Sequence, residues 1–207
     1  MTPTLPRTLR TLALVLCAAT APSLPSAAPA PARPSAATPL PSDSVYQLSV
    51  VLTDQDGRQQ AFAARRGQPL LVSMFYTSCE FVCPMLVEAL NATRAKLSPE
   101  DRAHVPVLMV SFDPARDTVA VLKQTAEQRQ LDPAAWALAR TDAKGVRQIA
   151  AVLGIQYRAL ANGDFNHSTS LILLDAEGRV IARTSHLGDA DPEFVMKVRA
   201  VVRAAAP

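Results

Sequence analysis

The chain has 207 residues, of which 49% are hydrophobic and 19% charged, and its formal net charge is +3. This composition provides the core of one folded domain and excludes a disordered polyampholyte. It also excludes a polytopic membrane protein, because no stretch approaches the ~20 consecutive apolar residues that span a bilayer. All 18 acidic residues lie at or beyond Asp43, whereas Arg7, Arg10 and Arg33 precede it. The folded part is therefore predicted to be neutral overall, without the basic surface that binds nucleic acid.

Residues 1–42 differ in composition from the rest of the chain, with nine of the 17 prolines and no acidic residue. Two arginines precede an apolar run over 12–21, which is followed by small residues and prolines, the order typical of a secretory signal peptide. We predict a signal peptide or N-terminal anchor over 1–32, with its cleavage site left open, and a Pro/Ala-rich tether over 33–42. Residues 43–207 are then an exported, periplasmic domain, either soluble or tethered to the inner membrane by an uncleaved leader.

The first half of this domain predicts a β-hairpin followed by a βαβ unit. Residues 45–52 alternate and are β-rich, and a turn at Asp56-Gly57 leads into 59–62, so we expect a hairpin added at a sheet edge. The segments 69–76 and 105–111 are nearly continuous apolar runs, typical of strands covered on both faces. Between them, apolar residues recur at helical spacing, which predicts a helix joining two parallel strands.

The second half of the chain predicts three helices and three strands. The helices are expected to begin after Thr118, Asp142 and Asp191, and the strands to span 136–139, at an edge, 171–174 and 180–184. This order of elements is that of an α/β protein with a thioredoxin-like fold, in which a central mixed sheet carries helices on both faces and an added N-terminal β-hairpin.

Export changes the cysteine count, because Cys17 lies in the leader and leaves Cys79 and Cys83 as a pair. Both lie between a buried strand and a helix, which is the crevice where open α/β sheets bind ligands. Pro84 is expected at the first helical position, so that both sulfurs lie near the positive end of the helix dipole, which favours thiolates. A separation of four residues lets two sulfurs hold one metal ion at about 2.3 Å each, or close a disulfide.

Two thiolates leave a metal undercoordinated, so a third ligand is expected from elsewhere in the fold. His104 precedes a strand and is predicted at the opposite end of the sheet, and His186 follows the last strand. His167 precedes the strand at 171–174, and in a thioredoxin-like sheet that loop faces the cysteines, so it is the expected ligand. Two thiolates and one imidazole suit Cu(I), and with an added ligand Cu(II), whereas structural zinc sites normally have a fourth strong protein ligand.

Three motifs occur in the order TSCEFVCP at 77–84, SFDPARDT at 111–118 and NHS at 166–168. Together they resemble the Sco/SenC family of thioredoxin-fold copper chaperones, and the resemblance extends from about Val45 to the last helix. It implies that Cys79, Cys83 and His167 bind copper. It also implies delivery of copper to, or thiol reduction of, the copper A site of cytochrome c oxidase. The sequence departs from the family pattern at two places: Asn166 stands where many members have Asp, and residues 136–140 stand where members usually have a Leu-Thr-Gly motif. A copper protein other than cytochrome c oxidase is therefore still an alternative as the partner.

Two functions follow from these residues. The first is a monomeric periplasmic metallochaperone that binds copper and supports assembly of the copper A centre, with the apo copper A subunit or another periplasmic copper protein as partner, and that transfers metal rather than catalysing a reaction. The alternative is a thiol:disulfide oxidoreductase in which Cys79 and Cys83 reduce partner cysteines, with a thiol reductant protein as a further partner. The CxxxC spacing, and the lack of proline in 166–170, argue against general redox turnover. A permanent structural disulfide is a third, weaker interpretation.

Asp113 ends a central strand next to the cysteine-bearing one. One expectation is functional: Asp113 accepts a hydrogen bond that orients a metal ligand, or it provides a charge that docks a partner. The other expectation is structural, an Asx turn with Pro114. Arg116 and Asp117 are expected to form a local ion pair and helix cap.

Overall fold

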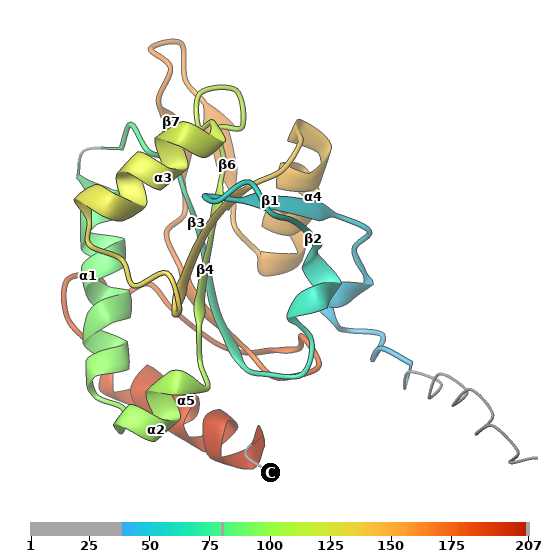
Figure 1. Ribbon diagram of the computed structural model, residues 1–207, viewed down its shortest axis with the longest axis vertical. Coiled ribbons are helices and arrows are strands. Elements are labelled where there is room, and N and C mark those ends of the chain that lie inside the picture. The colour runs from blue at the N-terminus through green and yellow to red at the C-terminus, as the bar shows by residue number, and fades with distance from the viewer. Residues whose placement is uncertain (1–38, 80, 206–207) are drawn as a thin grey trace, which may run out of the picture. The chain divides into compact units, whose positions relative to one another are not determined.

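The structure is a computed structural model that describes residues 39–79 and 81–205. The predicted signal peptide or anchor, Cys17 and residues 33–38 of the tether lie outside the described residues. A seven-stranded mixed sheet forms the centre of the domain, in the order β2-β1-β5-β4-β3-β8-β9 (Figure 1). Its strands are β1 (Val51–Asp54), β2 (Gln59–Ala61), β3 (Leu70–Phe75), β4 (Val107–Ser111), β5 (Trp136–Arg140), β8 (Leu171–Leu174) and β9 (Val180–Thr184).

The βαβ unit is confirmed and forms the middle of the sheet. Every residue of β3 and β4 is buried, and the two strands pair in parallel with Leu71 opposite Val107. Helix α1 (Val82–Ala95) connects them and buries Leu86, Val87 and Leu90. Apolar side chains on both faces of both strands explain why the sequence shows no alternation there.

The N-terminal hairpin is added to the sheet as predicted. Strand β1 pairs with β2 and, on its other side, antiparallel with β5, where Thr53 lies opposite Arg140. Strand β5 is consequently internal rather than at the edge where the sequence placed it. Residues 45–47 form a short 3-10 helix, η1, instead of the start of a strand, because the Ser44 hydroxyl accepts a hydrogen bond from the Tyr46 amide and caps it.

Helices cover both faces of the sheet, as expected. Figure 1 shows α3 in front of the sheet and α4 behind it. The helices other than α1 are α2 (Pro99–Ala103), α3 (Val119–Gln128), α4 (Ala143–Leu153) and α5 (Pro192–Ala205). Thr118 and Asp142 are the N-caps of α3 and α4, and Asp191 accepts hydrogen bonds from the first amides of α5, all as predicted.

A separate two-stranded sheet was not expected from the sequence. Strands β6 (Tyr157–Ala159) and β7 (Phe165–His167) pair antiparallel, with Tyr157 opposite His167. We call residues 157–167 the histidine hairpin. It places His167 at the end of a strand, where a loop was predicted.

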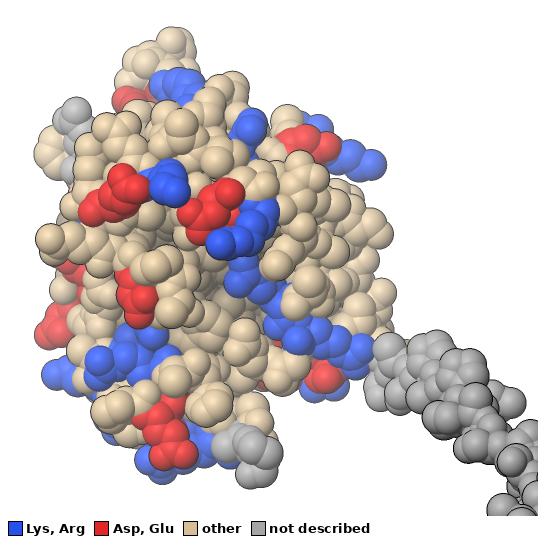
Figure 2. Space-filling model, viewed as in Figure 1, with Lys and Arg blue, Asp and Glu red and all other residues tan. Residues whose placement is uncertain are grey.

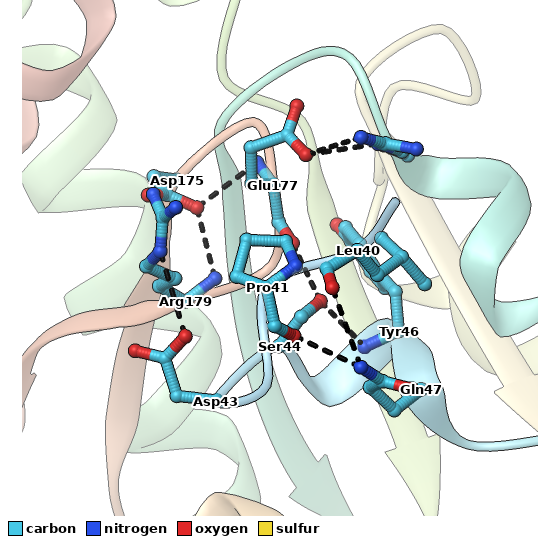
Figure 3. Close-up of polar contacts among 10 residues, drawn as sticks. Leu40, Pro41, Asp43, Ser44, Tyr46, Gln47, Asp175, Glu177 and Arg179 are labelled. Carbon is cyan, nitrogen blue, oxygen red and sulfur yellow. Dashed lines mark hydrogen bonds and ion pairs between the residues drawn. The ribbon is translucent and has the colours of Figure 1, made fainter. Parts of the chain in front are cut away.

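The first described residues pack against the turn between β8 and β9 (Figure 3). The Ser44 hydroxyl donates to the Glu177 carbonyl at 2.5 Å, the Val45 amide donates to the Gly178 carbonyl at 2.9 Å, and Asp43 pairs with Arg179 at 3.5 Å. Because Leu70 at the start of β3 lies opposite Leu174, this turn is at the end of the sheet away from the cysteines.

Charges of both signs are interspersed on the surface of the described domain. Figure 2 shows Lys and Arg side chains beside Asp and Glu side chains on the face viewed. Ion pairs such as Arg66 with Glu177 at 2.5 Å and Lys123 with Asp56 at 3.5 Å connect them. Over residues 39–79 and 81–205, no helix combines the length and apolar character needed to cross a membrane.

Candidate metal centre

Cys79 and Cys83 lie at the start of α1, but the helix begins earlier than predicted. Its first residue is Val82, so Cys83 is the second residue and Pro84 the third. Phe81 precedes the helix and provides no side-chain cap. The backbone amides of residues 81–83 instead lie near the Cys79 sulfur, where their hydrogen bonding favours its thiolate. Pro84 fits at the third position because the first four helical amides have no partner within a helix.

The two thiols, although both are buried, have different acidities. Burial opposes ionisation of Cys79, but hydrogen bonds from the Cys83 amide and thiol and from the Val82 and Phe81 amides outweigh it and lower its pKa. Burial raises the pKa of Cys83 from 9.0 to about 12, and the neighbouring Cys79 adds to the rise. The reduced pair is therefore expected to hold its negative charge on Cys79.

Tyr76 connects the cysteines to the histidine hairpin, a role that the sequence analysis missed. Burial raises the pKa of Tyr76, as do the charge of Cys79 and a side-chain hydrogen bond with that thiol, whereas a hydrogen bond from the Phe165 backbone lowers it. The Tyr76 ring also packs edge-on against Phe165, at 5.1 Å between centroids, and against His167, at 5.9 Å. Tyr76 thus contacts both the expected sulfur ligand and the expected nitrogen ligand. An aromatic residue at the end of a strand that leads to the cysteines was the available signal.

His167 lies on the cysteine side of the sheet, as predicted, but is not joined to the two sulfurs. Its half-buried ring is 5.0 Å from that of Phe112, and Nδ1 lies 3.2 Å from the Ser168 carbonyl oxygen. It borders a surface hollow of about 470 Å³ that residues 156–158 also line. Among the described residues, no three His, Cys, Asp or Glu side chains are close enough together to hold a metal ion. A metal held by all three expected ligands requires His167 or the cysteine loop to move.

The other two histidines lie at opposite ends of the sheet, and only His186 follows a strand that ends on the cysteine side. His104 is the exposed C-cap of α2, before β4, at the opposite end of the sheet, as predicted. His186 is exposed after β9, where its amide donates to the Thr184 hydroxyl and its charge affects Asp191.

The loop after β4 differs from its predicted arrangement. The expected ion pair between Arg116 and Asp117 is replaced by one between Arg116 and Asp113. Asp113 also accepts a hydrogen bond from the Arg116 amide at 3.3 Å, which is a local turn contact, whereas its role in orienting a metal ligand or docking a partner stays a prediction. Asp117 is 1% exposed and binds Thr77, two residues before Cys79. The sequence could not reveal these partners, because 40 residues separate Asp117 from Thr77.

A family model described as SCO1/SenC matches residues 42–203. The chain belongs to the SCO1/SenC family. A SCO1 protein homolog of Bacillus subtilis (strain 168) is 28% identical over 83 residues, which make up 40% of this chain and 42% of that protein. The match thus spans less than half of that curated relative.

Two solved Sco structures share the architecture of this SCO1/SenC protein. Yeast Sco1, crystallised with copper bound, is 20% identical with a TM-score of 0.63, covering 76% of this chain and 88% of that one. BsSco, a member of the Sco family of cytochrome c oxidase assembly proteins in which a disulfide switch was identified, is 20% identical with a TM-score of 0.63, covering 74% and 91%. The likeness confirms the thioredoxin-like fold predicted from the order of elements.

Proposed function

We propose that this SCO1/SenC protein is a periplasmic copper metallochaperone. It binds copper through Cys79, Cys83 and His167, and passes the metal to the apo copper A subunit of cytochrome c oxidase or to another periplasmic copper protein. The observation that carries the proposal is the Cys79 sulfur at the start of α1, next to Cys83 and joined through Tyr76 to the hairpin that bears His167. Family membership and the copper bound to yeast Sco1 support the choice of metal.

The donor set fits copper as cargo. Two sulfurs and one imidazole nitrogen are soft ligands that suit Cu(I), and a further ligand would complete a Cu(II) site. Cys79 provides a sulfur that already favours the thiolate, whereas the Cys83 thiol must give up its proton when the metal binds, so uptake releases protons. Three protein ligands leave a coordination position open, where a thiolate of a partner can add before a ligand of this protein leaves.

The proposed location depends on the leader. Residues 1–32 act as a signal peptide or an uncleaved anchor and 33–42 as a tether, which brings residues 43–207 into the periplasm as a monomeric domain.

The ligand set is tested by anaerobic copper titration of the reduced protein, with X-ray absorption at the copper edge to count sulfur and nitrogen neighbours. We expect one tightly bound copper per chain, and weaker binding with one nitrogen neighbour fewer in His167→Ala. His104→Ala is the matched control, because it removes an exposed histidine at the other end of the sheet. Unchanged binding in His167→Ala would refute the assignment, and loss in His186→Ala would move it to that residue.

A second function, thiol:disulfide exchange, is favoured by the unequal acidities of the two cysteines. A thiolate at Cys79 could attack a partner disulfide, after which Cys83 would displace the partner's second thiol. The Cys79/Cys83 pair would lose two electrons and two protons when it forms its own disulfide. The partner disulfide would take up these electrons and protons and become two thiols. Rapid insulin reduction that survives in His167→Ala, but not in Cys79→Ser, would favour this function over metal transfer.

A further inference from the structure

The loop between β4 and α3 contacts both segments that carry the expected copper ligands. We call residues 112–118 the bridging loop. Two adjacent side chains within it have different partners. Arg116 binds the histidine hairpin, and Asp117 binds the loop that leads to Cys79. The chemistry proposed above assigns no role to either side chain.

Asp117 holds the cysteine side. Its carboxylate accepts hydrogen bonds from the Thr77 backbone amide at 3.2 Å, from the Thr77 hydroxyl, and from the Ser111 hydroxyl at 2.5 Å. Asp117 is 1% exposed, and the hydrogen bonds that its carboxylate accepts within the described residues all come from neutral donors. A buried carboxylate needs these bonds, because losing them would leave its charge unsolvated. Thr77, and with it the start of the cysteine loop, is therefore fixed to the bridging loop.

Arg116 holds the histidine side. Its guanidinium donates through Nε to the Asp113 carboxylate and through Nη2 to the carbonyl oxygen of Gly163. Gly163 lies in the turn of the histidine hairpin, with φ of +86°, and a Cβ built there would lie 3.0 Å from the Arg116 Nη1 atom. Asp164 adds an attractive charge beside the same guanidinium. Arg116 thus reaches the turn four residues before His167.

The histidine hairpin needs such an attachment, because it is outside the main sheet. Its two strands pair only with each other in the described sheets, and rings of Tyr157, Phe165 and His167 pack on Phe112. Stacked rings leave a hairpin some freedom to slide and rotate. A hydrogen-bonding guanidinium adds a directional contact that fixes the turn against the bridging loop.

We propose that Arg116 and Asp117 are positioning residues that together set the separation between the two cysteines and His167. This inference rests on the proposed function, since it supposes that these three residues bind the same copper ion. Residues 116 and 117 are adjacent in the chain, so these two attachments limit how far the segments that carry the ligands can move apart.

Hydrogen exchange in the metal-free, reduced protein tests the two attachments without copper. In Arg116→Ala we expect the Leu160 and Gly163 amides, which close the hairpin turn, to exchange about five- to tenfold faster. In Asp117→Asn the Thr77 amide should exchange faster by a similar factor, and the hairpin amides should not change. Lys123→Ala is the matched control for Arg116, since it removes an exposed cation that pairs with Asp56. Unchanged hairpin exchange in Arg116→Ala would overturn the proposal whatever the protein does with copper.

Copper binding then tests whether the attachments matter for the ligands. Arg116→Ala should weaken Cu(II) by about five- to tenfold and reduce the nitrogen hyperfine coupling in its electron paramagnetic resonance spectrum, with a smaller effect on Cu(I) held by two sulfurs. Arg116→Lys should restore part of the Cu(II) affinity and part of the nitrogen hyperfine coupling. If His167→Ala weakens Cu(II) but Arg116→Ala does not, the positioning role is wrong. If His167→Ala does not change the Cu(II) affinity, the proposed ligand set is wrong. This result is distinct from the test of the attachments, which measures amide exchange in the histidine hairpin without copper.

Discussion

The unequal acidities of Cys79 and Cys83 predict unequal rates of alkylation in the reduced, metal-free protein. Burial raises the pKa of Cys83 from 9.0 to about 12, so near pH 8 its thiolate fraction is about a thousandfold below that of an ordinary thiol. A more basic thiolate is intrinsically more nucleophilic, which raises the alkylation rate of the ionised form about twentyfold. Cys83 should therefore react about 50-fold more slowly than an ordinary thiol, and Cys79, whose pKa is lowered, should react first.

The assay is a pulse of iodoacetamide over a range of pH, followed by peptide mapping by mass spectrometry to quantify each site. Physical access does not distinguish the two residues, because Cys79 is 7% exposed and Cys83 is 4% exposed. In concentrated guanidinium both should react at the same rate, which controls for the chemistry of the reagent. Equal labelling of the two sites in the folded protein near pH 8 would refute the reasoning that the start of α1 stabilises one thiolate and burial suppresses the other.

Three further predictions concern stability and the Tyr76 contact. The folded state favours the protonated Cys83 thiol, so the free energy of unfolding of the reduced protein should be unaffected by this group below about pH 9 and should fall by about 2 kcal/mol as the pH rises to about 10.5. Urea unfolding should not detect this fall in Cys83→Ala. Gly178→Ala should lower the free energy of unfolding by about 2 kcal/mol more than Gly57→Ala. Both glycines have φ near +80°, but only at Gly178 would the new Cβ lie 2.5 Å from the Tyr46 ring, so equal losses in urea would contradict the steric argument. Tyr76→Phe removes a hydrogen bond to Cys79 and should shift the alkylation midpoint of that residue to higher pH, whereas an unshifted profile would exclude Tyr76 as a partner of the thiolate.

The sequence predicted the parts of the fold whose signals are local. Continuous apolar runs identified β3 and β4, and capping residues such as Asp142 and Asp191 identified the starts of α4 and α5. The histidine hairpin was missed because each of its strands has three residues and none shows alternation long enough to recognise. What stabilises it is ring packing on Phe112, a contact more than 40 residues away in the chain that no local pattern encodes.

The positions of the candidate ligands could be predicted from the sequence, whereas their supporting contacts could not, and their role as ligands stays a prediction. Spacing and helix position indicated Cys79 and Cys83, and topology placed His167 at the same end of the sheet. The predicted start of α1 was wrong by two residues, because proline fits the third helical position as well as the first, and the amides near the Cys79 sulfur leave no signal in the sequence. The partner of Asp117 was missed for the same reason, since its buried hydrogen bonds depend on how two loops meet.

Both ends of the described chain lie at the end of the sheet opposite the cysteines. Residues 43–45 pack on the turn between β8 and β9, and Arg203 near the end of α5 lies 4.0 Å from Asp101 of α2, below the start of β4 (Figure 1). A fusion tag or surface linkage at either end of this domain would therefore hold it with Cys79, Tyr76 and the histidine hairpin facing outward. Immobilised in this way, the domain would present its candidate site to partners in solution, which suits it to direct measurements of metal transfer on a sensor surface.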